Sequence, residues 1–413
     1  MITYERFVLS NGLRVLFYQD PTTPMAVVNT LYDVGAKDEH PDRTGFAHLF
    51  EHLMFGGSIH IPDFDAPLQL AGGQSNAFTS NDITNYYNVL PAENLETALW
   101  LESDRMLSLA FSEKSLEVQR NVVIEEFKQR YLNQPYGDTW LEFRPLAYEK
   151  HPYQWATIGK CLEHIETATM DEVKAFFAKH YNPQNAILCI AGNFQLEDIK
   201  ERVESWFGAI PSGEKYVRNL PKEPAQTQFK LKEIERDVPN NMFYYGFKMP
   251  GKHEEGYYAC DLLSDLLGRG KSSRLYKLLK KELNLVTSVS AFVLGSHDTG
   301  LLVISGQLTD GATFEKVDEA LWNLLEELTQ APIAEKEVKK NVNKFKTTKV
   351  FSELGVLNIA MALCEHELMG NANGINEELA HYEKLTAETL LATAKQTLKK
   401  SNCSSLRIKS KKV

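Results

Sequence analysis

The feature that most constrains the fold is an order of strand-like and helix-like segments that occurs twice along the 413-residue chain. Alternating apolar residues predict strands, and apolar residues that recur every three to four positions predict helices. The first half gives strands near residues 7–9, 13–17, 26–34, 74–80, 84–90 and 186–191, and helices from about 44 and near 93–108, 113–131, 171–180 and 196–207. This order indicates two related domains.

The second half repeats the order after a segment without apolar periodicity. Residues 211–228 are rich in proline, glycine and charge, which is typical of a linker. Beyond them we predict strands at 229–234, 242–247, 287–293, 301–308 and 404–408, and helical segments within 257–283, 314–328, 335–369 and 386–399. The predicted division is therefore a first domain over 1–212, a linker over 213–228 and a related second domain over 229–413.

Strands followed by runs of helices are typical of the α+β class. We expect two duplicated α/β-layer domains in which helices pack on one face of a mainly antiparallel sheet. Local signals fix parts of this order: residues 10–12 (Ser-Asn-Gly) between two apolar runs predict a hairpin, and Thr169 with Glu172 predicts a capping box at a helix start.

Charge and composition exclude several classes of protein. The formal net charge of −10 argues against a general nucleic-acid binder, which needs a surplus of lysine and arginine. No run of 18 apolar residues predicts a membrane span, and the five cysteines show no CxxC spacing. The start of the sequence lacks the pattern of an export signal, so we expect a cytoplasmic protein, or a periplasmic one if a signal has been removed.

The chemistry centres on His48, Glu51 and His52, which form an H-x-x-E-H pattern within one predicted helix. Positions i, i+3 and i+4 lie on the same face of a helix. Two imidazoles one turn apart can bind zinc at ~2.0–2.1 Å, and the carboxylate between them reaches water on the metal rather than the metal itself. The alternative is a helix with two paired histidines, but His and Glu are costly to bury among Phe46, Leu49, Phe50 and Phe55 without partners.

A zinc ion with two histidine ligands and an open water position needs a third protein ligand. The best candidates lie on a later predicted helix, where Glu126 shares a face with Gln119. Spacing alone leaves Glu125 open as well.

Taken together, these residues show that the chain resembles the pitrilysin-like peptidases, the clan that includes insulin-degrading enzyme and the mitochondrial processing peptidase. The match includes His48-Leu-Phe-Glu-His52, the strand at 76–80 with the residues 81–86 that follow, and Arg120-Asn-Val-Val-Ile-Glu-Glu126. It continues through Tyr181-Asn-Pro183 and the duplicated second half, so it covers essentially the whole chain.

The resemblance implies a zinc metalloendopeptidase with one zinc per chain and Glu51 as general base. It also implies that Glu126, rather than Glu125, is the third ligand. The strand at 76–80 is implied to be a sheet edge to which a peptide substrate adds as an extra strand, with Asn76, Ala77 and Phe78 at the substrate site.

Two departures from the family pattern affect this expectation. Pitrilysin and insulin-degrading enzyme have a glutamate seven residues before the third ligand, whereas this chain has Gln119, whose amide cannot accept a proton. Related enzymes also carry an arginine and a tyrosine, seven apart, in the half without the metal. Here Lys280 and Thr287 stand at these two positions, so the oxyanion-stabilising pair is degraded.

An intact metal motif beside a degraded pair leads us to expect the zinc-bearing subunit of a heterodimer, whose homologous partner supplies the arginine and tyrosine. A self-sufficient homodimer is the alternative. A different class of function is a non-catalytic assembly or scaffold subunit that keeps the fold. Nucleotide binding through residues 268–272 (Gly-Arg-Gly-Lys-Ser) is excluded, since a P-loop needs glycine where Asp265 stands and a preceding strand.

Overall fold

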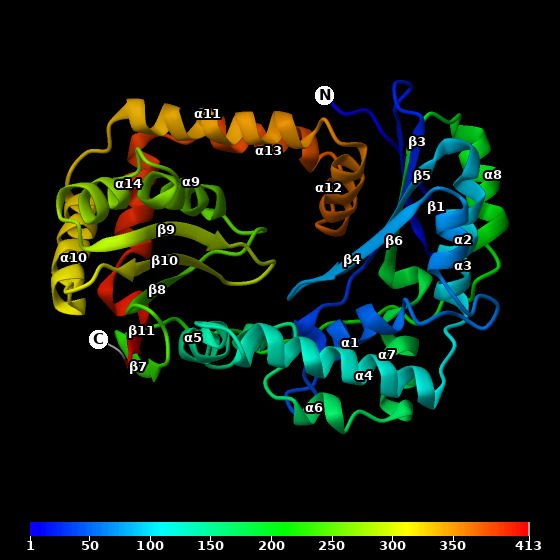
Figure 1. Ribbon diagram of the computed structural model, residues 1–413. Helices are drawn as coiled ribbons and strands as arrows, with labels where there is room; N and C mark the ends of the chain where they lie inside the picture. The colour runs from blue at the N-terminus through cyan, green and yellow to red at the C-terminus, as the bar shows by residue number, and fades with distance from the viewer. Residues whose placement is uncertain (412–413) are drawn as a thin grey trace. The chain divides into compact units, whose positions relative to one another are not determined.

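The computed structural model describes residues 1–411, which form two compact units (Figure 1). Unit 1 comprises Met1–Lys128, Trp155–Leu220 and Lys349–Glu377, and unit 2 comprises Gln129–Gln154, Pro221–Thr348 and Glu378–Val413. The predicted continuous domains at 1–212 and 229–413 do not coincide with these units. Each unit takes one segment from the opposite half of the sequence, although the predicted linker itself contains no helix or strand.

Unit 1 is built on a six-stranded sheet in the order β1-β2-β6-β3-β5-β4. All neighbours are antiparallel except β2 and β6, which are parallel. The strands are β1 (Glu5–Val8), β2 (Arg14–Gln19), β3 (Met25–Tyr32), β4 (Gln74–Thr79), β5 (Thr84–Pro91) and β6 (Ala186–Gly192). The predicted hairpin joins β1 to β2, and Gly12 takes the left-handed backbone (φ 92°) that its turn requires.

The helices of unit 1 include those that carry the H-x-x-E-H motif and both candidate glutamates. They are α1 (Phe46–Leu53), α2 (Asp65–Leu70), α3 (Leu95–Leu107), α4 (Glu113–Phe127), α6 (Glu163–Glu166), α7 (Met170–His180), α8 (Leu196–Phe207) and α12 (Val356–Leu368). The predicted capping box is confirmed at α7, where the Thr169 side chain accepts from Glu172 N and the Glu172 carboxylate accepts from Thr169 N.

Unit 2 has a five-stranded sheet in the order β7-β11-β8-β10-β9, with only β7 and β11 parallel. Its strands are β7 (Lys230–Arg236), β8 (Met242–Met249), β9 (Val286–Leu294), β10 (Gly300–Leu308) and β11 (Cys403–Ser410). Its helices are α5 (Thr139–Ala147), α9 (Tyr257–Gly268), the π-helical η6 (Tyr276–Glu282), α10 (Phe314–Gln330) and α14 (Ala387–Thr397).

Three helical segments run from one unit into the other, and the remaining helical elements are single turns. The three are η3 (Lys128–Leu132), which prolongs α4, α11 (Glu335–Ser352) and α13 (Gly374–Glu383). The turns are η1 (Ala36–Asp38), η2 (Ala92–Asn94), η4 (Pro152–Gln154), η5 (Pro183–Asn185) and η7 (Lys400–Asn402).

The two sheets correspond strand by strand, which confirms the predicted duplication. The order β2-β6-β3-β5-β4 of unit 1 matches β7-β11-β8-β10-β9 of unit 2, and the one parallel pair occupies the same place in both. The α+β class and the mainly antiparallel sheets are therefore as the sequence predicts.

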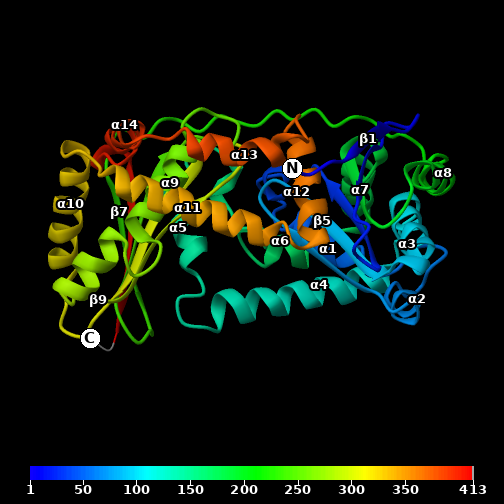
Figure 2. The ribbon, with the colours of Figure 1, turned by 90° about the horizontal axis from the view of Figure 1, so that it is seen from above.

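Helices cover both faces of each sheet, so the expectation of a single covered face is wrong. In unit 1, α12 contacts β3 and β6, and Figures 1 and 2 both show it on the side of the sheet opposite α3 and α8. In unit 2, Phe243 and Phe247 of β8 pack with α9, α10 and α14, whereas Tyr244 packs with Phe143 of α5. Since α12 comes from the second half of the sequence and α5 from the first, the halves exchange one covering helix.

The predicted helical segment at 335–369 is two helices. The helical conformation is interrupted at residues 353–355, and Gly355, with extended backbone, is the N-cap of α12. Helices α2, α5 and α13 are not predicted at all, and α5 has Pro145 in its interior. Within residues 1–411 no single helix is long and apolar enough to cross a membrane, and the pair α11 and α12, bent by 113°, meets that criterion only when its two helices are combined.

Candidate metal centre

Helix α1 holds the H-x-x-E-H motif on one of its faces. Phe46, Leu49 and Phe50 are buried on the other face, where the Phe50 ring stacks on Tyr181 of the α7–β6 connection at 5.1 Å. His48 and His52 are only partly buried, and their ring centroids lie 4.8 Å apart. The apolar residues therefore fix the rotation of α1 and direct both imidazoles to the same side.

Helix α4 brings Glu126 to these imidazoles. Glu126 Oε2 lies 3.6 Å from His48 Nε2 and 3.3 Å from His52 Nε2. Val123, Ile124 and Phe127 of α4 are buried, so the carboxylate is held by a packed helix. Among the described residues, these three are the group of His, Cys, Asp and Glu side chains whose ligand atoms all lie within 4.8 Å of one another.

The donor set fits zinc in type and spacing. Two imidazole nitrogens and one carboxylate oxygen form one of the ligand sets that leave a tetrahedral zinc a position for water. Ligand atoms at ~2.0–2.1 Å from a tetrahedral ion are about 3.3 Å from one another. The separations of 3.3 and 3.6 Å from Glu126 to the two histidines are close to that value.

Glu126, and not Glu125, meets the histidines. The Glu125 side chain is exposed, and its carboxylate accepts a hydrogen bond of 2.7 Å from Lys128 Nζ. The sequence alone left both residues open, and the packing of Val123 and Phe127 decides between them because it sets which face of α4 is turned inward. Gln119 is half-buried on the same helix, seven residues before Glu126.

Glu51 is placed beside this donor set as a partly buried carboxylate. Its burial raises its pKa above the usual value, while Thr79 and the neighbouring His52 oppose the rise. Thr79 is the last residue of β4, so the sheet edge and the motif helix meet at Glu51. The family resemblance placed the strand at 76–80 near the substrate site, but the specific contact between Thr79 and Glu51 was not predicted, because Thr79 belongs to no ligand pattern.

The strand β4 is an edge of the unit 1 sheet, because it pairs only with β5. Asn76 and Phe78 are exposed, and Ala77 between them is half-buried. The Asn76 side chain accepts a hydrogen bond from Ala77 N at 2.9 Å. An exposed edge whose last residue neighbours Glu51 has the geometry that strand addition requires.

Lys280 and Thr287 lie together in unit 2. Lys280 Nζ donates to the carbonyl oxygen of Thr287 and also lies 5.7 Å from the centre of the Tyr276 ring. The Thr287 hydroxyl contacts the Gln307 carbonyl at 3.2 Å. The Lys280 side chain thus bonds to the backbone of Thr287, the Thr287 side chain bonds to Gln307 of β10, and neither side chain is a phenol or a guanidinium.

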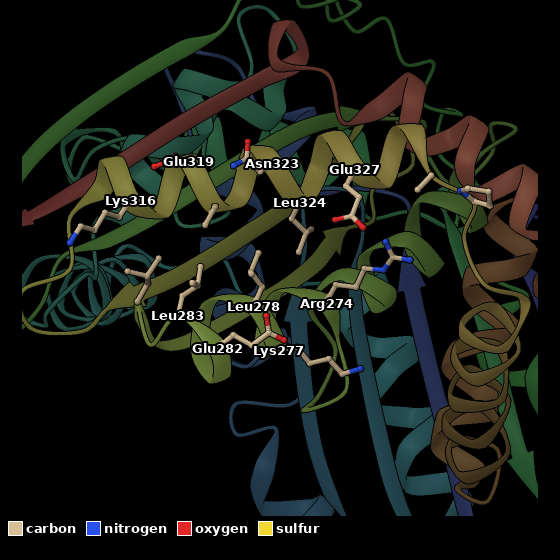
Figure 3. Close-up of a pocket in the computed structure, with 14 residues that line it drawn as sticks. Arg274, Lys277, Leu278, Glu282, Leu283, Lys316, Glu319, Asn323, Leu324 and Glu327 are labelled. Atoms are coloured by element: carbon tan, nitrogen blue, oxygen red, sulfur yellow. The ribbon is translucent and has the colours of Figure 1, made fainter.

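Unit 2 contains a cavity of about 730 Å³ (Figure 3). Its walls are α10 and the segment that includes η6, and Leu324 from the first wall and Leu278 and Leu283 from the second point into it. Charged residues of both signs, among them Lys316 and Glu282, surround these leucines. The lining contains none of the residues of the metal centre.

A duplicated α+β fold that carries two histidines and a glutamate on two helices defines a class of zinc proteases. Comparison with family models agrees: residues 14–139 match the model described as insulinase, peptidase family M16, and residues 167–345 match the model described as the peptidase M16 inactive domain. The chain belongs to peptidase family M16, to which the pitrilysin-like resemblance pointed.

Individual relatives extend over nearly the full chain. The zinc protease PqqE of Helicobacter pylori is 27% identical over 98% of this chain and 93% of its own length. An uncharacterized zinc protease of Bacillus subtilis, YmxG, is 26% identical over 84% of each chain.

Solved structures show the same fold. A protease from Helicobacter pylori superposes with a TM-score of 0.93 at 27% identity, covering 99% of this chain and all of that one. Pitrilysin has a TM-score of 0.79 at 19% identity, and the match covers 99% of this chain but 45% of pitrilysin.

Proposed function

We propose that the chain is a zinc metallopeptidase that hydrolyses peptides or unfolded protein segments, with Glu51 as general base. The observation that carries the proposal is the convergence of His48, His52 and Glu126, from two helices, beside the partly buried Glu51. Without a metal, these partly buried polar side chains would lie close together and lose solvation without a compensating bond.

In the proposed reaction, His48, His52 and Glu126 hold the metal. Zinc supplies a Lewis acid that polarises the scissile carbonyl and lowers the pKa of water towards ~7. Glu51 accepts the proton of the attacking water and passes it to the leaving amine, and the raised pKa of its carboxyl brings it closer to that task. The edge of β4 aligns the substrate backbone, so that recognition tolerates many sequences.

The adjacent glutamates of α4 provide the test. Glu126→Gln removes a ligand, whereas Glu125→Gln changes a solvent-exposed carboxylate on the same helix turn. We expect zinc analysis to find one ion per chain in the wild type and in Glu125→Gln, and a large loss of zinc and of peptide cleavage in Glu126→Gln. Equal zinc content in both variants would contradict the assignment.

We further propose that the active form is a dimer, in which a homologous partner supplies the arginine and tyrosine that Lys280 and Thr287 replace. Pitrilysin supports this at the level of fold. This chain matches only 45% of its length, so the pitrilysin chain has room for two such halves, and a dimer of this chain would have a comparable size. The chain alone and the chain with a candidate partner should be compared by native mass and peptide cleavage. Cleavage at rates typical of enzymes by a pure homodimer would favour the homodimer instead.

A non-catalytic scaffold subunit is the second candidate. The replacement of the arginine and tyrosine by Lys280 and Thr287 favours it, and a structural relative from Pseudomonas fluorescens, described as a peptidase M16 inactive domain, shows the fold with a TM-score of 0.89. Zinc binding without cleavage in any partner combination would support this alternative.

A further inference from the structure

The first turn of α1 lacks a cap of its own. Its N-cap residue is Gly45, which has no side chain and a left-handed backbone (φ 92°). A Cβ at Gly45 would lie 2.7 Å from both the Ile158 carbonyl oxygen and Ile165 Cδ1, so a capping Ser, Thr, Asp or Asn does not fit. The buried backbone N–H groups of this turn, which have no partner within the helix, must therefore be satisfied from another part of the chain.

Glu39 provides both acceptors from outside the helix. Its Oε2 accepts from Gly45 N at 2.9 Å, and its Oε1 accepts from Ala47 N at 2.8 Å. A third donor, Trp155 Nε1, reaches Oε2 at 3.1 Å. The residue is 6% exposed, so these bonds are shielded from water, where hydrogen bonds to a charged group are strongest.

We propose that Glu39 is a positioning residue for the metal centre: it fixes the first turn of α1 and thereby the direction of the His48 imidazole, which follows Ala47 directly. The inference rests on the proposed function, since it concerns the same zinc ligands. A zinc site tolerates ligand distances only within about 0.2 Å of their ideal values, so a small displacement of this turn weakens the site.

The charge and shape of the carboxylate both matter. Burial raises the pKa of Glu39, whereas the hydrogen bonds from Gly45, Ala47 and Trp155 lower it because they stabilise the ionised form. Three N–H donors on its two oxygens favour the ionised carboxylate, which accepts at both. In Glu39→Gln one oxygen becomes an NH₂ group that faces a backbone N–H. The amide can satisfy only one of the two α1 donors in this geometry.

Asp38, the residue directly before Glu39, offers a matched control. It is also a buried carboxylate in the same loop, but its oxygens accept from Arg218 and Gly35 N and from no residue of α1. Asp38→Asn therefore removes a buried ion pair of unit 1 without touching the motif helix. Both variants should unfold more readily than the wild type, so stability alone does not separate them.

The discriminating measurement is the zinc dissociation constant of the full-length chain, determined by competition with a chromophoric chelator. We expect Glu39→Gln to bind zinc about tenfold more weakly, as with loss of other supporting groups around metal sites, and Asp38→Asn to bind it as the wild type does. If Glu39→Gln does not fold, Glu39→Asp keeps the charge but is one methylene shorter, and it should still bind zinc more weakly than Asp38→Asn.

Each outcome separates the inference from the proposed function. Equal zinc affinities for the Glu39 and Asp38 variants, with wild-type cleavage intact, would overturn the positioning role and leave the peptidase proposal standing. Zinc binding that depends on Glu39 in a chain that cleaves no peptide with any partner would support the positioning role and overturn the peptidase proposal. A wild-type chain that binds no zinc would overturn both.

Discussion

At the scale of single residues, the proposed chemistry depends on carboxylates whose surroundings differ. Glu51 and Glu126 are partly buried beside two histidines, whereas Glu125 is exposed and paired with Lys128. The sequence could predict His48, Glu51 and His52 together because one helix turn relates them. It could not predict Glu39 or Thr79, because their contacts with the motif depend on how distant segments pack.

Glu51→Gln tests the general base. We expect the variant to keep zinc, because the side chain is not a ligand, and to lose about 10²- to 10⁴-fold in turnover, because an amide accepts no proton. Metal analysis with steady-state peptide cleavage would measure both effects, and His48→Ala should lose the metal. Turnover of Glu51→Gln close to that of the wild type would exclude this residue as the base.

His180 predicts how stability depends on pH. Its side chain is buried against Phe176 and Tyr216, each at a ring-centroid distance of 4.6 Å. Burial, together with the nearby charges of Lys179 and Arg218, lowers its pKa from 6.5 to about 3. Between these values the unfolded chain binds the proton and the folded chain does not, so stability is complete above pH 6.5 and falls as the pH decreases towards 3.

The variant His180→Phe should remove this dependence. The loss in the wild type is about 1.4 kcal/mol per pH unit within that window, and the variant should lose correspondingly less between pH 6 and pH 4. Urea unfolding of both proteins at several pH values measures the difference, in which the contributions of other titrating groups cancel. Parallel pH profiles would show that His180 is not the group responsible.

At the scale of helices and strands, local signals predicted those elements that a few neighbouring residues determine. The β1–β2 hairpin and the capping box of α7 are examples. The break between α11 and α12 was not predicted, because helical periodicity continues through Gly355 and only packing of α12 on β6 requires the turn. Helix α5 was missed as well, since Pro145 in its interior argues against a helix.

Gly268 shows what the glycine-rich segment at 268–272 does in the fold. A Cβ at this last residue of α9 would lie 1.9 Å from Ala291 N and 2.5 Å from Ala291 Cβ on β9. The glycine therefore allows close packing of helix and strand in unit 2, in agreement with the exclusion of a P-loop.

Gly268→Ala should accordingly destabilise the protein by about 3 kcal/mol, since overpacked sites force backbone shifts. Gly311→Ala is the comparison: Gly311 has a φ of 77° but no atom within 4 Å of an added Cβ, so only backbone strain of about 1 kcal/mol applies. Denaturant unfolding of both variants gives the difference. Equal effects would show that β9 can move away from α9.

At the scale of the whole molecule, the sequence halves are not the structural units. Apolar periodicity predicts that α12 has a buried face but does not say which sheet buries it. Ile359, Leu363 and Cys364 of α12 pack with Leu16 and Ile187 of the unit 1 sheet. The duplication was visible in the order of elements, whereas the exchange of α5 and α12 was not, because it joins residues that are distant in sequence.

This exchange predicts that neither half folds by itself. Separate fragments 1–212 and 229–413 each lack one helix that covers their sheet, so each should expose apolar surface, bind a hydrophobic dye and show no cooperative unfolding. Mixing the fragments should restore cooperative unfolding and suppress dye binding. A fragment 1–212 that unfolds cooperatively without its counterpart would contradict the structural importance of α12.

The same exchange determines when unit 1 can fold during translation. Domains usually acquire their structure in the order in which they leave the ribosome. Here the sheet of the unit that carries the histidines cannot be covered on both faces until residues 349–377, far downstream of the histidines, have emerged. A nascent chain truncated before residue 349 holds the complete ligand set in its sequence, yet an assembled metal centre should form only after residues 349–377 have emerged.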